Sequence, residues 1–165
     1  TTQRISDIAT YNGKLYILDA AKDQIMSHSA TGTGFTKGTT WVTSPELSNA
    51  VSMAIDGAIY LLTADGNVIK YLRGADQHFA LEEMQTPLTS PVDIFTSDAI
   101  TSLYILDSAN NRVVVTDKDG ALIRQLVSDK FNKASSLFVT KDKGKETLYV
   151  LSSDSVFEVK SPAAL

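Results

Sequence analysis

The stretch Leu15-Tyr16-Ile17-Leu18-Asp19 decides the fold, because it returns three more times along the chain. The later copies are Ile59-Tyr60-Leu61-Leu62-Thr63, Leu103-Tyr104-Ile105-Leu106-Asp107 and Leu148-Tyr149-Val150-Leu151-Ser152. Successive copies are offset by 44, 44 and 45 residues, and a tyrosine is second in each copy. A period of this length indicates a repeat architecture in which every unit is one supersecondary structure.

The segments around each copy repeat in the same order. A shorter apolar strand is predicted before each copy, at 6–10, 51–55, 92–96 and 136–140. In the first two units, Asn12-Gly13 and Asp56-Gly57 lie between this shorter strand and the repeated stretch. These dipeptides supply the positive φ of tight hairpins. A third strand follows at 24–29, 68–72, 112–116 and 156–160, and the first three units add a fourth at 39–42, 79–85 and 121–127. Each unit is therefore predicted to be an antiparallel meander.

The repeated strand is apolar on both alternating faces, so each face needs a cover. Meanders stacked face to face around an axis supply that cover. We therefore predict an all-β protein, a β-propeller of four blades that form one domain, with blades at about 5–49, 50–90, 91–134 and 135–165. The last blade lacks its fourth strand, and the four repeated tyrosines are expected to pack between blades.

Residues 103–126 resemble an NHL-type propeller repeat. The shared features are an apolar strand that ends in Asp107, a loop with Asn110-Asn111-Arg112, a second apolar strand and the turn Asp117-Lys-Asp-Gly120. The resemblance is good over 91–127 and fair over 5–46, whereas the second unit has Thr63 and the fourth has Ser152 in place of the aspartate. It implies a binding or interaction propeller of the sensor or scaffold type within a larger signalling protein.

Closure of the propeller is left open by the sequence. Residues 1–5 precede the first inner strand, and five extended residues span at most about 17 Å, too little for a rim strand and a return to the axis. The chain could close on itself as four blades, be a fragment of a longer propeller, or pair with a second copy as four plus four blades. Because uncovered blade faces would expose apolar patches, we expect a fragment that self-associates.

Composition excludes several classes of function. The 165 residues carry a formal net charge of -4, which argues against nucleic acid as a partner. No apolar run reaches the roughly 20 residues of a membrane span, and the chain has no cysteine. His28 and His78 are expected at the surface and are too few for the metal sites of the propeller lyases and lactonases related to this family. We therefore expect no enzyme, no cofactor and no metal, and a protein or peptide partner, including a second copy.

The candidate contact residues are mainly carboxylates near the channel and the loops. They are Asp7, Asp93, Asp19, Asp107, Asn110, Arg112 and Trp41. Asp107 is expected first as a turn residue that accepts N–H groups of its loop and meets Arg112, and rim packing is the simpler role for Trp41. The contact face is predicted at loops 20–24, 64–67, 108–111 and 152–155 together with 43–50, 86–91 and 128–135. The alternative is a lyase-like or lactonase-like propeller enzyme, in which Asp7 and Asp93 hold a metal ion in the channel.

Overall fold

The computed structural model describes residues 5–160, which form β-strands and four short 3-10 turns. The first blade holds β1 (Ile5–Tyr11), β2 (Lys14–Asp19), β3 (Gln24–Thr31), β4 (Gly34–Phe35) and β5 (Thr39–Thr43). The second holds β6 (Ala50–Ile55), β7 (Ala58–Thr63), β8 (Val68–Leu72) and β9 (Ala75–Asp76). The third holds β10 (Pro91–Phe95), β11 (Ser102–Asp107), β12 (Arg112–Asp117) and β13 (Leu122–Val127), and the fourth holds β14 (Ala134–Asp142), β15 (Lys145–Ser152) and β16 (Ser155–Lys160).

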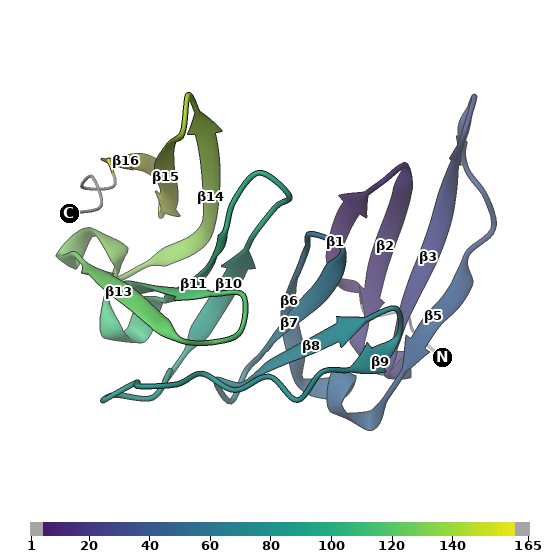
Figure 1. The fold of residues 1–165 in the computed structure, drawn as a ribbon, viewed down its shortest axis with the longest axis horizontal. Coiled ribbons are helices and arrows are strands. Elements are labelled where there is room, and N and C mark those ends of the chain that lie inside the picture. Colours follow the sequence, from purple (N-terminus) through teal and green to yellow (C-terminus); the bar gives the residue numbers. More distant parts are fainter. Residues whose placement is uncertain (1–4, 161–165) are drawn as a thin grey trace.

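Every pair of neighbouring strands is antiparallel, and the four sheets follow chain order apart from the β3–β5 pairing. The inner strands β1, β6, β10 and β14 pack on one another in that order. Figure 1 shows the four blades arranged around a common axis, with blade 1 at the right and blade 4 at the upper left. The prediction of an all-β propeller with four blades and a three-stranded last blade is confirmed.

Three apolar clusters lie between successive blades and hold them together. Leu18 of blade 1 and Leu61 of blade 2 belong to the first cluster, and Leu62 of blade 2 and Ile105 of blade 3 belong to the second. Val113 of blade 3 belongs to the third cluster, between blades 3 and 4. All six residues of β7 and all six of β11 are buried, because each strand has a blade on both sides. In β2 and β15 burial alternates instead, because one face of each terminal blade has no neighbour.

The repeated tyrosines follow the same rule. Tyr16, Tyr60 and Tyr104 are buried between blades, as predicted. Tyr149, at the equivalent position in blade 4, is only partly buried, because no blade packs against that face.

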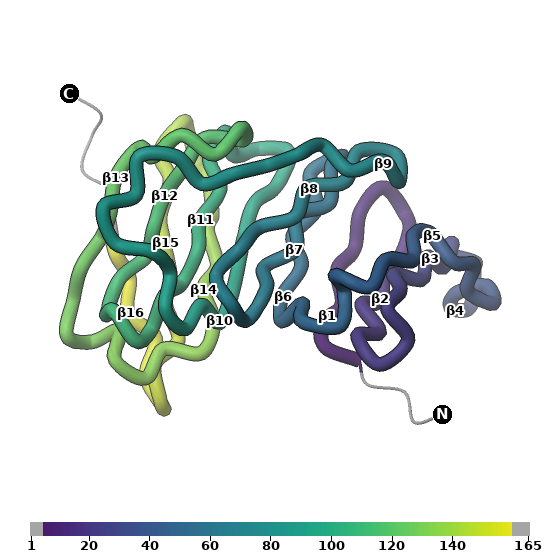
Figure 2. Tube along the Cα trace, turned by 90° about the horizontal axis from the view of Figure 1, so that it is seen from below, coloured from purple at the N-terminus to yellow at the C-terminus, as the bar shows by residue number. Residues whose placement is uncertain are grey.

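The prediction of a rim strand at 79–85 is wrong. The fourth strand of blade 2 is the short β9, and residues 79–85 form no strand. This segment instead places Phe79, Leu81 and Met84 against the core between blades 2 and 3. Figure 2 shows the chain running from β9 across blade 3 before it enters β10. Apolar side chains that gain a buried contact across the blade boundary thus override pairing along β8.

β14 begins at Ala134, one residue before the boundary expected for blade 4. Within residues 5–160, no helix is long and apolar enough to span a membrane.

Candidate functional site

A ladder of aspartate and serine side chains follows the inner strands around the channel. The pairing of each inner strand shifts register just before one residue, and that residue is Asp7, Ser52, Asp93 and Ser136 in turn. A bulge of this kind re-aims a side chain. We call these four residues the Asp–Ser ladder.

Asp7 joins blade 1 to blade 2. Its Oδ2 accepts hydrogen bonds from the Met53 backbone N–H at 2.7 Å and from Ser52 Oγ at 3.1 Å, and its Oδ1 accepts from its neighbour Ile8 at 2.7 Å. Burial raises the pKa of the Asp7 carboxyl above its ordinary value, and the nearby Asp93 charge adds to that rise. The three hydrogen bonds act in the opposite direction.

Asp93 repeats this arrangement between blades 3 and 4. Its Oδ2 accepts from Ser136 Oγ and from the Leu137 N–H, both at 2.7 Å. Its Oδ1 accepts from the Ile94 N–H at 3.0 Å and lies 2.8 Å from Ser52 Oγ, whose one proton is shared with Asp7 Oδ2. Between blades 2 and 3, Ser52 Oγ takes the place of the carboxylate and accepts from the Ile94 N–H at 3.3 Å.

The two channel carboxylates therefore meet at one serine hydroxyl, which lies within hydrogen-bond distance of both. All four carboxylate oxygens already accept protein N–H or O–H groups. Within residues 5–160, no three His, Asp or Glu side chains come together in a group that could hold a metal ion. Backbone N–H donors that fill the lone pairs favour a connecting role for Asp7 and Asp93.

Asp107 forms the centre of a second cluster, in the loop between β11 and β12. This carboxylate is fully buried and lies 2.9 Å from Nε and 2.8 Å from Nη2 of Arg112. Asn110 Nδ2 donates to it at 2.7 Å, and the N–H groups of Thr89 and Ser90 donate at 3.3 and 3.2 Å. The expected pairing with Arg112 is seen. The expected acceptance of N–H groups from its own loop is not: that loop supplies only the Asn110 side chain, and the backbone N–H donors belong to the connection between blades 2 and 3.

Arg112 extends this cluster to the connection between blades 2 and 3. Its Nη2 donates to the carbonyls of Thr86 and Pro87 at 2.9 and 2.8 Å, and its Nη1 donates to Gln125 Oε1 at 2.9 Å. A planar guanidinium with five donors suits such a site. The predicted contact loops 86–91 and 108–111 are therefore joined. The Asp107 and Arg112 side chains themselves, however, bind groups of the same chain.

Asp19 occupies the equivalent position in blade 1 with fewer partners. It is buried, and Lys22 Nζ lies 3.3 Å from its Oδ2. Gln24 stands where blade 3 has Arg112. Among the residues that the structure describes, neither oxygen of Asp19 has a hydrogen-bond partner.

Trp41 packs at the rim between blades 1 and 2. Its ring is perpendicular to Tyr16 at 6.2 Å and to Tyr71 at 6.3 Å, measured between ring centroids. The side chain is half-buried, so most of its contact is internal.

The loops predicted for the contact face do lie together. The backbone bonds Ser44 N to Asp23 O, Ala64 N to Asn49 O and Ser128 N to Asn111 O join each second-to-third-strand loop to a connection between blades. A hollow of about 450 Å³ is lined there by Glu46, Asn49, Asp65 and the exposed His78, among others. His28 lies elsewhere, on β3, where its Nδ1 is 3.0 Å from the Thr36 carbonyl.

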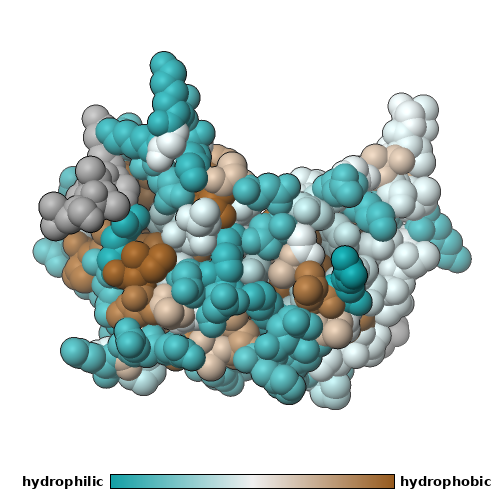
Figure 3. All heavy atoms as spheres, in the orientation of Figure 1, coloured by the Kyte–Doolittle hydropathy of each residue, from teal (hydrophilic) through white to brown (hydrophobic). Residues whose placement is uncertain are grey.

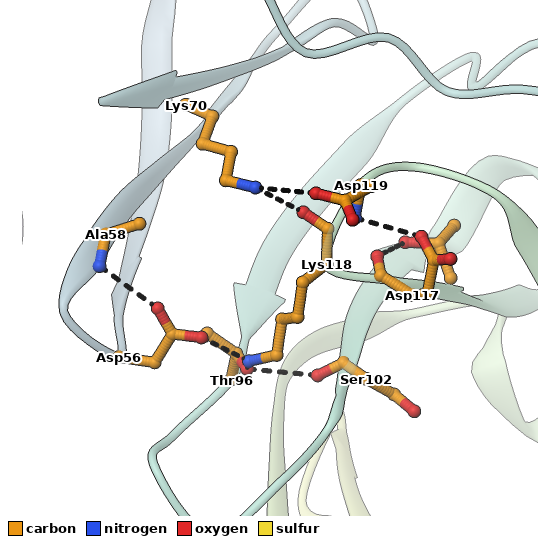
Figure 4. A network of polar contacts seen from close by, with 9 residues as sticks. Asp56, Ala58, Lys70, Thr96, Ser102, Asp117, Lys118 and Asp119 are labelled. Atoms are coloured by element: carbon orange, nitrogen blue, oxygen red, sulfur yellow. Dashed lines mark hydrogen bonds and ion pairs between the residues drawn. The ribbon is translucent and has the colours of Figure 1, made fainter. Parts of the chain in front are cut away.

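A polar network on the opposite end of blades 2 and 3 was not predicted. Lys118 Nζ contacts Asp56 and Thr96, and Lys70 Nζ donates to the Lys118 carbonyl at 2.7 Å and to Asp119 at 3.1 Å (Figure 4). Both ammonium groups lie over the Tyr60 ring, at 5.5 Å for Lys70 and 5.7 Å for Lys118. Asp56 and Lys118 lie in two different hairpin turns, Thr96 follows β10 and Lys70 lies on β8. Only the repeat register could have shown that these residues face one another.

The uncovered faces of the two terminal blades are both apolar. The first-blade face consists of Ile8, Leu15, Ile17 and Met26, and the last-blade face consists of Phe138, Tyr149, Leu151 and Val156. Exposure reaches 59% at Ile8, 54% at Phe138 and 65% at Val156. The space-filling view shows a hollow between the arms that end in these blades (Figure 3). Blades 1 and 4 of the same chain therefore do not bury each other.

Comparison with known proteins supports the fold and no further property. No protein-family model matches the chain, and no curated protein matches its sequence. Among solved structures, the computationally designed Ika4 protein aligns with a TM-score of 0.65 and 15% identity, over 97% of this chain and 92% of that one. Kuenenia stuttgartiensis hydrazine synthase gives 0.64 and 13% over 97% and 47%, and virginiamycin B lyase from Staphylococcus aureus gives 0.59 and 15% over 96% and 56%. The chain thus spans about half the length of the latter two.

Proposed function

We propose that this chain is a non-enzymatic interaction module, an NHL-like propeller of the scaffold or sensor type that binds protein through the uncovered faces of its terminal blades. The partner includes a second copy of the chain, so that four plus four blades assemble. One observation carries the proposal: each terminal blade leaves an apolar face in water. Ile8 and Val156 are exposed, whereas the residues at the position of Ile8 in the other blades (Met53, Ile94 and Leu137) and at the position of Val156 (Ile25, Val68 and Val113) are all buried. Contiguous apolar faces of this kind mark interaction sites.

The polar groups support a binding role over catalysis. The channel carboxylates accept backbone N–H groups, and the Asp107 cluster is buried among side chains and carbonyls of the same chain. Neither arrangement leaves a base or a nucleophile directed at an open pocket, which acid–base or covalent catalysis needs.

The runner-up is a propeller enzyme with a divalent cation in the channel. The observation that favours it is the convergence of Asp7 and Asp93 on Ser52. Calcium or manganese that raised the Tm of the wild type, but not that of an Asp7→Asn variant, would favour this alternative over the interaction module.

The test of the proposal is the mass of the chain in solution. Light scattering after size-exclusion chromatography should give twice the mass of one chain at high concentration. Ile8→Glu should give one chain's mass, because it places a charge in the first-blade face. Ile123→Glu is the matched control, since Ile123 is 50% exposed on β13 of a central blade, and it should leave the doubled mass unchanged. A wild-type monomer throughout the concentration range contradicts self-association.

A further inference from the structure

We propose that two copies of this chain join end to end, with the last-blade face of each packed against the first-blade face of the other, and that each contact reproduces the junction between blades 2 and 3. The inference rests on the proposed function and adds to it the identity of the docked surface, its register and its hydrogen bonds.

The two faces are the two halves of one blade junction. Between blades 3 and 4, Tyr104 and Leu106 of blade 3 pack with Leu137 and Val150 of blade 4 in one buried cluster. Strand pairing places Tyr149 and Leu151 at the positions of Tyr104 and Leu106. By the same pairing, Ile8 and Ile17 occupy the positions of Leu137 and Val150. The last-blade face thus corresponds to the face of blade 3 that contacts blade 4. The first-blade face corresponds to the face of blade 4 that contacts blade 3.

The Asp–Ser ladder also matches across this contact. The order along the chain is Asp7, Ser52, Asp93, Ser136, so aspartate and serine alternate from blade to blade. A second copy that follows blade 4 brings its own Asp7 next to Ser136. That neighbour pair, serine then aspartate, is the one seen between blades 2 and 3, where Ser52 Oγ lies 2.8 Å from Asp93 Oδ1.

The hydrogen bonds of the N–H group that follows each ladder position agree with this register. In each internal junction, the N–H of the residue after the ladder position donates to the ladder residue of the preceding blade: Met53 to Asp7, Ile94 to Ser52 and Leu137 to Asp93. At blade 1 the corresponding N–H, that of Ile8, donates to the carboxylate of the adjacent Asp7, as the Ile94 N–H donates to Asp93. The Ile94 N–H also donates to Ser52 of the preceding blade, and Ile8 has no preceding blade in its own chain. In the assembly, Ser136 Oγ of the other copy accepts from the Ile8 N–H and lies between its own Asp93 and the incoming Asp7, which share its one proton, as Ser52 Oγ lies between Asp7 and Asp93.

Two such contacts close the assembly. In a two-fold arrangement the last blade of each copy meets the first blade of the other, so that both apolar faces of both copies are covered.

A mixing experiment tests which face meets which. Ile8→Glu and Phe138→Lys should each be monomeric alone by light scattering, with wild-type circular dichroism. An equal mixture of the two should regain the doubled mass, because one contact of the mixed pair is then unaltered and the other brings Glu against Lys. If like faces met instead, one single variant would stay dimeric and mixing would restore nothing, which overturns the proposal.

Disulfide formation tests the register. The chain has no cysteine, so the double variant Asp7→Cys/Ser136→Cys can cross-link only through its introduced thiols, and the single variants report pairing of like thiols. Under mild oxidation most of it should become a covalent dimer on a non-reducing gel. Each single variant, and the control Ile123→Cys/Ser136→Cys, should stay largely uncross-linked.

The outcomes separate the two proposals. A wild-type dimer whose mixed variants re-associate, but whose thiols at 7 and 136 do not join, retains the interaction module and overturns the ladder register. A wild-type monomer overturns the end-to-end contact with a second copy altogether.

Discussion

At the scale of single residues, Asp107 and Arg112 show how a charge is kept in the core. The carboxylate is fully buried and the guanidinium is 5% exposed, yet together they have partners on three chain segments. Breaking a buried pair by removing one partner costs far more than the pair contributes, because an uncompensated charge remains.

We therefore expect Arg112→Met to lower the free energy of unfolding by about 3–5 kcal/mol. Urea denaturation followed by circular dichroism measures this. Asp119→Ala is the control, because it removes the exposed Lys70–Asp119 pair, in which Asp119 is 90% exposed, and should cost under about 1 kcal/mol. Equal losses in the two variants would mean that the Asp107 site is solvated.

The stability of the fold should depend on pH through Asp7. Burial raises the pKa of the Asp7 carboxyl above its ordinary 3.8, so the folded chain holds this proton more tightly than the unfolded chain does. Ionisation of Asp7 therefore favours unfolding.

The unfolding free energy of the wild type, minus that of Asp7→Asn, should fall as the pH rises from 3.8 through the raised pKa and then level off. Urea denaturation of both proteins over a pH series gives this difference. A difference that grows with pH would show that the hydrogen bonds from Met53, Ile8 and Ser52 outweigh burial and lower the pKa instead.

Some of these residues could be identified from the sequence, and others could not. Asp107, Asn110 and Arg112 were found because they lie within six residues of one loop, where turn chemistry is local. Asp7 and Asp93 were found by their equivalent positions, but their partners could not be, since Ser52 and Ser136 belong to other blades. Lys70 and Lys118 were missed because 48 residues separate them and their contact depends on how two blades stack.

At the scale of strands and segments, the best-predicted elements are those with a repeated apolar pattern. β2, β7, β11 and β15 all contain the repeated stretch that first indicated them. The segment 79–85 differs, because its apolar residues serve a contact between blades that no local period records. Its backbone also approaches the turn at Gly120, where Glu82 N donates to the Gly120 carbonyl at 3.0 Å.

Because of this close contact, Gly120 should not tolerate a larger side chain. Its φ is +105°, and a Cβ there would lie 1.9 Å from the Ala80 carbonyl oxygen. Gly120→Ala should cost about 2–4 kcal/mol, since overpacking adds to the strain of a positive φ.

Gly144→Ala is the matched control, because Gly144 also has a positive φ, +82°, and no atom lies within 4 Å of the position of its Cβ. It should lose only about 1–2 kcal/mol from backbone strain. Urea denaturation of both variants isolates the contact with Ala80, and equal losses would show that segment 79–85 yields to the methyl group.

At the scale of the whole molecule, the number and order of the blades followed from the period alone, but the state of the two ends did not. Whether blades 1 and 4 cover each other depends on the angle by which each blade is rotated relative to the preceding blade. No local sequence pattern specifies that angle. The exposed Ile8 and Phe138 show that they do not.

Energetics favour a closed assembly over a chain of single contacts. Four apolar side chains on each face become buried at one contact, and at about 1 kcal/mol for each half-buried side chain this gives roughly 8 kcal/mol. Association costs about 4–15 kcal/mol in lost freedom of motion. One contact is therefore marginal, whereas the second contact of a closed pair forms without a further loss of translational freedom.

The alternation of the Asp–Ser ladder restricts the number of blades that a closed ring can contain. Blades 1 and 3 share an aspartate on the inner strand, an aspartate at the end of the second strand and a 3-10 turn after it, whereas blades 2 and 4 share none of these. The structural period is therefore two blades, not one. Any ring that continues this pattern must contain an even number of blades, because an odd ring would set two aspartates or two serines side by side at one seam.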